Sequence, residues 1–435
     1  MTDGSSWVNK MIRLPGMTVL DVVDGDDELV ITVESTAESV FCRGCGERAE
    51  AQDRTPRSVR DLACFGRPVR LVIRQRRWRC RRVWCASKTW TEDLEQLCDT
   101  AVLTRRAGAE ACRQVGQHAR PVAVVAREFG VCWWTVMNAT IEHGTPLADD
   151  PDRVGPVIKL GVDETSFQAA RPGQATRYVT GLVDLDRCRM IDLVRGNAAA
   201  DLRRWCANAD PVWLSGISVV ATDLAESYRA GLSPHLDHAT RVADPFHVVR
   251  VANRCVDKVR RRVQNDTKGH RGRKRDPLFR VRKLLLSGAE RLTDDGARRF
   301  ELGLRAGDPR DEVLGAWLAK EGVRDVYLAE NRADAELLLD KTIAGCKADD
   351  VAEVRSLGDT LARWRTEILA HHSTGASNGP TEGLNLLVKE VKRCGRGFEN
   401  FEHYRLRVLL RAGRPVWPHR PSPPILRTRN PHAYA

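Results

Sequence analysis

Two aspartates follow apolar stretches that have the composition of buried strands. Asp163 comes after "VIKLGV", and Asp223 comes after "ISVVAT". Neighbouring strands lie about 4.8 Å apart, so two strands that pair in parallel bring both carboxylates to one end of a sheet. Carboxylates that close repel each other unless a cation lies between them, and Mg²⁺ prefers oxygen ligands. The spacing therefore predicts a magnesium site of the kind that serves phosphodiester chemistry.

A site with two metal ions needs a further acid. The residues alone offer Glu382, Asp244 and Glu226, and they do not decide among the three. Glu164 follows Asp163 directly, and the alternation of side chains along a regular strand predicts that it points away. Acids at strand ends are also common as helix caps, and this structural interpretation competes with the metal site.

A second group of residues has the spacing of zinc ligands. Cys42 and Cys45 form a C-x2-C pair, and Cys80 and Cys85 form a C-x4-C pair. Two thiolate pairs joined by a β-rich connector predict a closed, structural Zn²⁺ site. Cys64 lies between the pairs as an alternative ligand, and four unrelated buried cysteines are the other interpretation. The chain shows no secretion signal, so most of its thirteen cysteines are expected to be reduced.

The composition favours a nucleic-acid partner. The formal net charge is +12, and a basic chain of this length most often binds a polyanion. No apolar run approaches 18 residues, so we expect a soluble protein without a membrane partner. The run "RQRRWRCRRVW" interleaves arginines with tryptophans beside the second cysteine pair. Such a run can contact phosphates and bases, although a solvated strand face is the alternative.

The segment "PVAVVAREFGVCWWTVMNATIEHG" indicates two short helices. The first spans 122–128, the chain turns at Gly130, and the second helix begins near Cys132. This pattern predicts a helix-turn-helix whose second helix enters the major groove, although any pair of short helices can look similar. The candidate DNA contacts are Arg77, Trp78 and Arg79 beside the zinc segment, Trp134, Thr135 and Asn138 on the second helix, and Arg261, Arg273 and Lys274 in a later basic stretch.

The elements that must position these residues can be read from hydrophobic periodicity. A hairpin is expected over 17–35, and 143–156 reads as a linker. Five strand candidates follow, at 157–164, 177–185, 189–196, 216–223 and 239–249, with a helix over 198–210. Three strands in a row followed by helix and strand predict a mixed α/β sheet. From 248 to 370 the chain is mostly helical and begins very basic.

Several motifs together resemble one family. They are "GVDETSF", "VVATDLAESYRAG", "VADPFHVVRVAN" and "SNGPTEGLNLLVKEVKRCGRGFENFEHYRLR", with "CRGCG" and "RSVRDLACFGRPVRLVIRQRRWRC" before them. In this order they resemble the ISL3 family of bacterial insertion-sequence transposases over nearly the whole chain, roughly residues 17–411.

The resemblance implies a DDE transposase with a ribonuclease-H-like core interrupted by a helical insertion. It implies Asp163, Asp223 and Glu382 as the catalytic acids that hold two Mg²⁺ ions, for which Mn²⁺ can substitute. Asp244 and His247 of "DPFH" would flank this site. Glu382 would start a helix, and Arg393, Arg396 and Arg405 would lie near DNA phosphates, with a plain surface helix as the alternative.

The whole sequence therefore predicts a multidomain α/β protein. The expected partners are double-stranded DNA, as terminal inverted repeats and as target, and a second copy of the chain; the expected location is the bacterial cytoplasm, at the nucleoid. A nuclease that does not join strands, a DNA-binding regulator and an RNA-binding protein are the alternatives.

The predicted divisions are a β-rich zinc segment (1–96), a helix-turn-helix (97–148), the first core part (155–255), the basic insertion (256–372), the last core part (373–412) and a proline-rich tail (413–435).

Overall fold

The computed structural model describes residues 4–37, 39–97 and 102–418. The chain divides into two compact units, residues 1–153 with 402–435, and residues 154–401. Within the described ranges, no helix is long and apolar enough to cross a membrane. The predicted tail lies outside the described residues from residue 419 onward, as does the start of the predicted helix-turn-helix segment at 98–101.

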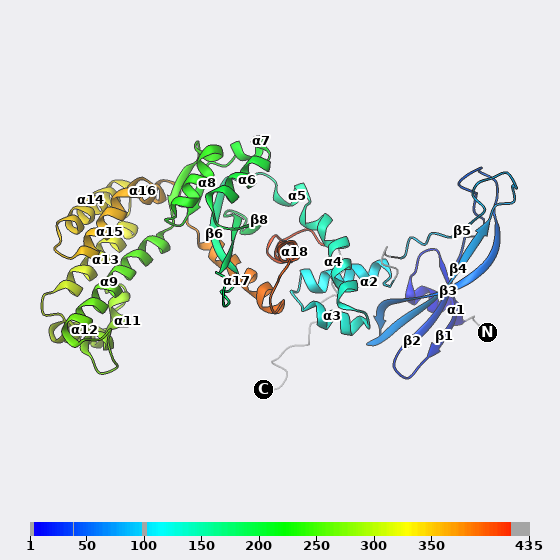
Figure 1. The fold of residues 1–435 in the computed structure, drawn as a ribbon, viewed down its shortest axis with the longest axis horizontal. Coiled ribbons are helices and arrows are strands. Elements are labelled where there is room, and N and C mark those ends of the chain that lie inside the picture. The colour runs from blue at the N-terminus through cyan, green and yellow to red at the C-terminus, as the bar shows by residue number, and fades with distance from the viewer. Residues whose placement is uncertain (1–3, 38, 98–101, 419–435) are drawn as a thin grey trace, which may run out of the picture. The chain divides into compact units, whose positions relative to one another are not determined.

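The first unit begins with a sheet in the order β1-β2-β4-β3, with β5 paired to β4 (Figure 1). β1 and β2 form the hairpin predicted over 17–35 and pair antiparallel. Long strands β3 and β4 extend toward the cysteine pairs, and Val33, Leu71 and Ile73 fill the core between the sheet and α1. The bounds are α1 (Gly4–Ile12), β1 (Met17–Asp24), β2 (Leu29–Ser35), β3 (Glu50–Cys64), β4 (Arg67–Arg79) and β5 (Thr89–Thr91).

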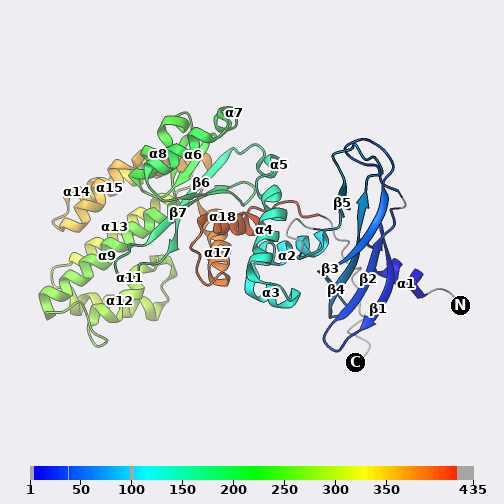
Figure 2. The same cartoon turned by 45° about the vertical axis from the view of Figure 1, so that its right-hand side comes forward.

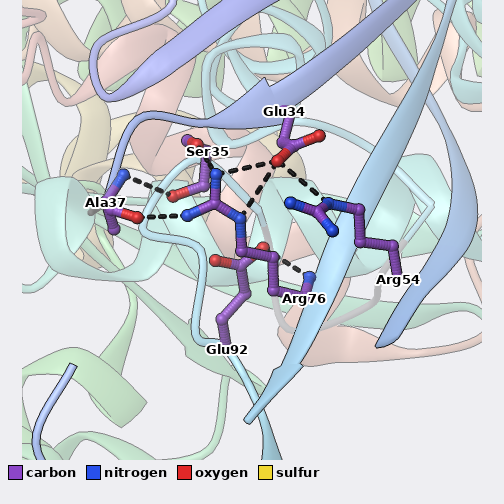
Figure 3. A network of polar contacts seen from close by, with 6 residues as sticks. All are labelled: Glu34, Ser35, Ala37, Arg54, Arg76 and Glu92. Atoms are coloured by element: carbon purple, nitrogen blue, oxygen red, sulfur yellow. Dashed lines mark hydrogen bonds and ion pairs between the residues drawn. The ribbon is translucent and has the colours of Figure 1, made fainter. Parts of the chain in front are cut away.

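An arginine network ties the strands of this sheet together (Figure 3). The Arg76 guanidinium on β4 donates to Glu34 Oε1 (2.8 Å) and to the Ser35 carbonyl (2.9 Å) on β2. Arg54 Nε on β3 donates to the same Glu34 oxygen at 3.0 Å, and Glu92 Oε1 accepts from the Arg76 backbone N–H at 2.7 Å. Arg76 therefore serves the fold of the sheet.

Helices complete the first unit. They are α2 (Arg105–Gly116), α3 (Val122–Phe129), α4 (Trp133–Ala148) and α18 (Phe401–Ala412). Gly130 ends α3 in the left-handed conformation (φ 63°), which glycine adopts without steric cost, and Cys132 caps α4. Part of the predicted linker is helical instead, since α4 continues to Ala148 and α5 (Pro151–Val154) follows.

The second unit is built on a mixed sheet in the order β10-β9-β6-β7-β8. β6, β7 and β8 pair antiparallel, whereas β9 pairs parallel to β6 and β10 parallel to β9. This confirms a mixed α/β fold, with all five predicted strands present. The bounds are β6 (Lys159–Gln168), β7 (Arg177–Asp184), β8 (Arg189–Arg195), α6 (Ala199–Asn208), α7 (Pro211–Ser215), β9 (Val219–Thr222), α8 (Glu226–Leu236) and β10 (Thr240–Ala243).

One strand is shorter than its sequence predicts. The segment 239–249 stays extended only to Ala243, because Asp244 caps a helix that begins at Pro245. Pro at the first helical position and Asp before it are strong helix starts. The apolar core beside the sheet packs Leu160, Val162 and Leu182 against Leu202 of α6 and Leu232 of α8.

Helices α9 to α16 of this unit form a bundle with its own core, in which α9, α13 and α15 pack together (Figures 1 and 2), whereas α17 packs against β6 and β7 of the sheet. α9 is one continuous helix, so it crosses the predicted boundary between 255 and 256. The bounds are α9 (Pro245–Lys268), α10 (Pro277–Arg280), α11 (Arg282–Leu286), η1 (Ala289–Arg291), α12 (Asp294–Gly307), α13 (Glu312–Leu328), α14 (Arg332–Ala348), α15 (Ala352–Arg363), α16 (Arg365–Thr374) and α17 (Gly379–Cys394).

Candidate active site and zinc centre

A cavity of about 640 Å³ lies beside the middle of β6, just past the point where its pairing with β9 stops, and is lined by Asp163, Asp223 and Glu382. We call it the acidic cavity. The strand register explains how the two aspartates meet. β6 and β9 pair in parallel up to Gly161 and Ala221, and each aspartate follows two residues later. Both carboxylates therefore lie next to each other where β6 and β9 part. Asp223 follows the end of β9 as predicted, but Asp163 does not end its strand, because β6 continues to Gln168.

Helix α17 brings the third acid. Glu382 lies in its first turn, as expected, where the helix dipole favours a negative charge. Close contact with β6 depends on Gly161, because a Cβ there would lie 2.4 Å from Thr381 Oγ1 and 2.7 Å from Asn378 Oδ1. Asn378 Nδ2 also donates to the Val162 carbonyl at 3.2 Å. The start of α17 is thus fixed against the strand that carries Asp163.

The two aspartates are costly to ionise where they lie. Burial raises the pKa of Asp163 to about 6, and the charges of Asp223 and Glu382 add to the effect. Burial also raises the pKa of Asp223 to about 6, and there the charge of Glu164 is the next cause. Hydrogen bonds to Asp163 oppose the shift, from Asn385 Nδ2 to Oδ2 (2.8 Å) and from the Glu164 backbone N–H to Oδ1 (2.9 Å). A cation in the cavity would relieve the remaining repulsion.

The donor set fits a hard divalent ion such as Mg²⁺. Asp223 Oδ1 is buried and has no hydrogen-bond partner among the described residues. A buried polar atom of that kind normally has a partner, so the orphaned oxygen is available as a ligand. The lining offers carboxylate oxygens and no thiolate, which suits Mg²⁺ or Mn²⁺.

Asp244 and His247 lie beside Glu382. One ligand atom from each of the three lies within 4.8 Å of the others, and His247 Nε2 is 4.0 Å from Glu382 Oε1. Asp244 is 2% exposed, caps α9, and accepts from the Asn378 backbone N–H at 2.8 Å. Burial lowers the pKa of His247, followed by the charge of Arg250, so the imidazole is neutral near pH 7.

The structure distinguishes between the two other acidic candidates, Glu226 and Glu164. Glu226 is exposed at the start of α8, pairs with Arg229 at 3.7 Å, and does not line the cavity. Glu164 contributes to the lining, but it points away from Asp163 as predicted. Asp163 contacts Asn385 of α17, whereas Glu164 lies on the face of β6 that carries the apolar core. Pairing with β9 stops at Gly161, so the edge of β6 is open beside both acids. Asn197 Nδ2 holds Glu164 Oε2 there at 2.8 Å.

The four predicted zinc ligands meet in the first unit. Ligand atoms of Cys42, Cys45, Cys80 and Cys85 all lie within 4.8 Å of one another. Sγ of Cys42 is 3.7 Å from Sγ of Cys85, and Sγ of Cys45 is 3.6 Å from Sγ of Cys80. Such a cluster suits a tetrahedral, closed zinc site without an open position for catalysis. Cys64, the alternative ligand, ends β3 and is not in the cluster.

Two predicted DNA contacts are wrong because their side chains face the interior. Trp78 is 3% exposed, and Thr135 is 7% exposed. On β4, Trp78 pairs with Trp90 of the short strand β5, and α4 turns Thr135 to its buried side. The remaining predicted contacts are exposed: Arg77, Arg79, Trp134, Asn138, Arg261, Arg273, Lys274, Arg393 and Arg396. Arg405 forms an ion pair with Asp149 at 3.4 Å.

Some exposed arginines already have acidic partners. Arg79 and Arg81 pair with Glu50, and Arg82 pairs with Glu47. In contrast, α4 carries neither lysine nor arginine, and its exposed side includes Trp134 (60% exposed) and Ile141 (36% exposed). This helix therefore offers no lysine or arginine to a phosphate.

Comparisons with known proteins agree with this geometry. Residues 160–408 match a transposase family profile, that of the ISL3 type with a DDE domain. Residues 38–85 match the zinc finger of the transposases of IS204, IS1001, IS1096 and IS1165. The chain is 26% identical over 384 residues to the transposase for insertion sequence element IS1001 of Bordetella parapertussis, covering 87% of this chain and 90% of the relative. It is also 26% identical over 331 residues to the transposase for IS1557 of Mycobacterium tuberculosis, covering 70% and 72%.

Proposed function

The chain belongs to the ISL3 family of transposases, and from this premise we propose that it binds the terminal inverted repeats of its insertion sequence and cuts and joins DNA strands there. The observation that carries the proposal is the meeting of Asp163, Asp223 and Glu382 in one cavity. They come from β6, the end of β9 and α17, which are far apart in the sequence. The mixed sheet supports the ribonuclease-H-like core that the resemblance implies.

Asp163, Asp223 and Glu382 would hold two Mg²⁺ or Mn²⁺ ions, whose chemistry is to activate the attacking oxygen and stabilise the leaving one. The protein's own contribution is placement. β6 and the Asn385 amide hold the Asp163 carboxylate at the open edge of the strand. Asn378 fixes the first turn of α17, and with it Glu382. Asp244 and His247 support this end of the cavity from α9.

The chemistry is phosphodiester exchange at phosphorus. In cleavage, water attacks the phosphodiester at the element end, the bond to the 3′ oxygen breaks, and that oxygen leaves as a 3′-hydroxyl. In joining, this hydroxyl attacks a phosphodiester of target DNA and displaces a new 3′ oxygen. Neither step needs a covalent bond to the protein, so no Ser, Tyr or Cys nucleophile is assigned.

The other segments supply DNA binding. The zinc segment and the predicted helix-turn-helix recognise the inverted repeats, and the basic insertion holds flanking DNA. Two copies of the chain are needed to hold two element ends together. A chain that acts on the bacterial chromosome works in the cytoplasm, at the nucleoid.

The test uses the zinc-loaded full chain and a labelled duplex that carries the element's own terminus. Cleavage is measured with Mg²⁺ and with EDTA for wild type and for Asp163→Ala, Asp223→Ala and Glu382→Ala. Asp186→Ala is the matched control, because Asp186 is an exposed acid of the same sheet unit outside the cavity. We expect cutting to need Mg²⁺ and to be lost in the three variants while binding persists.

Other outcomes assign other functions. Cutting without transfer of a supplied pre-cut end to target DNA would indicate a nuclease that does not join strands. Binding without cutting under either metal would leave a DNA-binding regulator. A preference for single-stranded RNA would indicate the RNA-binding alternative.

A further inference from the structure

A second pocket lies in the helical insertion, away from the acidic cavity. It measures about 220 Å³ and lies between α10 and α12. Arg275, Arg280 and Arg299 line it together with apolar residues, among them Leu302 and Val281. We call it the arginine pocket. Its existence depends on two helices that approach each other unusually closely.

Two glycines allow that approach. Gly303 and Gly307 are one helical turn apart on α12 and face the segment that carries α10. A Cβ at Gly303 would lie 2.6 Å from Val281 Cγ1, and a Cβ at Gly307 would lie 2.7 Å from Leu278 Cγ. Both distances are shorter than real side chains accept, so any larger residue would push the helices apart. The close contact places Arg275, which precedes α10, and Arg280, at the end of α10, in one pocket with Arg299 of α12.

Most of the positive charge of the pocket has no acidic partner among the described residues. No aspartate or glutamate is among its lining residues. In the part of the chain that the structure describes, the guanidinium groups of Arg275 and Arg280 make no hydrogen bond or ion pair, and Arg299 pairs only with Asp295, at 3.8 Å. Nearby Asp276 is engaged elsewhere, by the Arg273 backbone N–H and by His270. Three cations line one pocket, and only Arg299 has an acidic neighbour, so the pocket favours an anionic ligand.

We propose that the arginine pocket binds a backbone phosphodiester of double-stranded DNA. Guanidinium groups match the geometry of phosphate oxygens and bind them through paired N–H donors. The apolar floor, where Leu302 is 58% exposed, suits the deoxyribose beside the phosphate. The inference rests on the proposed function. It assigns one defined phosphate site to the helical insertion, in place of diffuse attraction by its positive charge.

The first experiment compares two triple variants of equal charge. One is Arg275→Gln with Arg280→Gln and Arg299→Gln; the matched control is Arg291→Gln with Arg310→Gln and Arg363→Gln, exposed arginines of the same insertion outside the pocket. Binding of the zinc-loaded chain to the terminal duplex, with flanking DNA included, is measured against salt concentration. We expect the pocket triple to bind at least about tenfold more weakly. Its salt slope should fall by about 0.9, the value for one released phosphate contact.

Equal losses in the two triples would overturn the proposal, because the arginines would then act only as diffuse charge. Ethylation interference adds a positional readout. In wild type we expect at least one phosphate whose ethylation blocks binding, and we expect that interference to vanish in the pocket triple. An unchanged pattern would also overturn the site. If wild type binds DNA and the two triple variants bind equally well, only the pocket assignment is rejected. If wild type does not bind DNA, the proposed function itself is rejected.

A second experiment changes the shape of the pocket and keeps every charge. Gly303→Ala forces α10 away from α12, while Gly345→Ala is the control, because a Cβ at Gly345 meets nothing within 4 Å. We expect weaker DNA binding only for Gly303→Ala. Competition with inorganic phosphate and with deoxynucleoside monophosphate separates the sources of the anion. If millimolar free phosphate lowers the DNA affinity of wild type to that of the pocket triple, the pocket is a site for small anions, and the DNA assignment is overturned.

Discussion

The aspartates of the acidic cavity are destabilising in the protein without metal, and this gives a prediction for Asp223→Asn. Burial and neighbouring acids raise the pKa of Asp223 from 3.8 to about 6. After allowance for partial exposure, we expect the substitution to raise the unfolding free energy of the metal-free protein by about 1–2 kcal/mol. Thermal unfolding with EDTA and with Mg²⁺ measures this.

The same pair of scans provides the control. Mg²⁺ should raise the melting temperature of wild type and should raise that of Asp223→Asn much less, because the ion binds only the folded protein and a ligand oxygen has lost its charge. Asp186→Asn should behave as wild type in both scans. An equal response to Mg²⁺ in all three proteins would place the ion elsewhere.

Individual residues differ in how far the sequence determines them. Asp163 and Asp223 each follow an apolar run, which predicts two strand ends; Asp223 does follow the end of β9, whereas β6 continues past Asp163 to Gln168. The residues alone could not identify Glu382 as the third acid over Asp244 and Glu226, because a long helical insertion separates it from the sheet in sequence. The family resemblance identified it. The alternation of side chains correctly predicts that Glu164 and Asp163 face opposite sides of β6, although both line the cavity because the edge of the strand is open there.

Among the elements, the contact between β6 and α17 positions the third acid, and a substitution at Gly161 tests it. A Cβ at Gly161 would overlap Thr381 and Asn378 at the start of α17. We expect Gly161→Ala to displace Glu382 and lower the cleavage rate by about a hundredfold, because a shift of about 1 Å can have that effect. DNA binding measured in parallel should stay within about twofold of wild type.

Gly181→Ala is a close control for this prediction. Gly181 lies opposite Asp163 on β7, and its nearest contact for a Cβ is the flexible end of Met190 at 3.4 Å. It should cut at nearly the wild-type rate. If both alanine variants lose cleavage equally, general strain in the sheet explains the loss, and the α17 contact does not.

The sheet of the first unit has an acid-sensitive element in the network of Figure 3. Burial alone raises the pKa of Glu34, but hydrogen bonds from Arg76 and Arg54 outweigh it and leave the pKa below 4.5. The network therefore stabilises the folded state fully above that pH and less as pH falls through the lower folded pKa. We expect wild type to exceed Glu34→Gln in unfolding free energy by about 1–2 kcal/mol at pH 7, with the gap closing as the pH falls below 4.5 and through the lowered pKa of Glu34.

Because both proteins carry the same zinc site, acid release of zinc cancels in the comparison. Denaturant unfolding at several pH values gives the difference directly. A gap that stays constant or widens on acidification would mean that the Glu34 carboxylate is not held charged by the two arginines.

Element types were more predictable than the directions of side chains. The hairpin over 17–35, the two helices around Gly130 and the five strands follow from hydrophobic periodicity and turn residues. Trp78 and Thr135 were expected to contact DNA, yet they are buried, because which face of a strand or helix is covered depends on packing partners far along the chain. The early end of β10 shows a local capping signal at Asp244 prevailing over an apolar run.

The path of the whole chain was not predictable from sequence. The predicted division keeps 373–412 together, whereas the compact units part after residue 401, and residues 402–412 of α18 belong with the N-terminal unit. The packing of this helix explains the difference. A Cβ at Gly116 of α2 would lie 2.8 Å from Leu410 Cδ1, and a Cβ at Gly144 of α4 would lie 2.8 Å from the same atom. Leu410 therefore fills a space that two glycines provide.

This packing predicts that the end of the chain stabilises its beginning. Leu410 is 1% exposed, so Leu410→Ala leaves a cavity and should lower the stability of the first unit by about 2–5 kcal/mol. Hydrogen exchange on the zinc-loaded full chain should show faster exchange in α2 and α4 and unchanged exchange in β6 and β9. Leu386→Ala, at a leucine of α17 that is 67% exposed, should change neither. Equal loss of protection in β6 and β9 would mean that the two units unfold as one, and unchanged protection in α2 and α4 would mean that α18 does not support them.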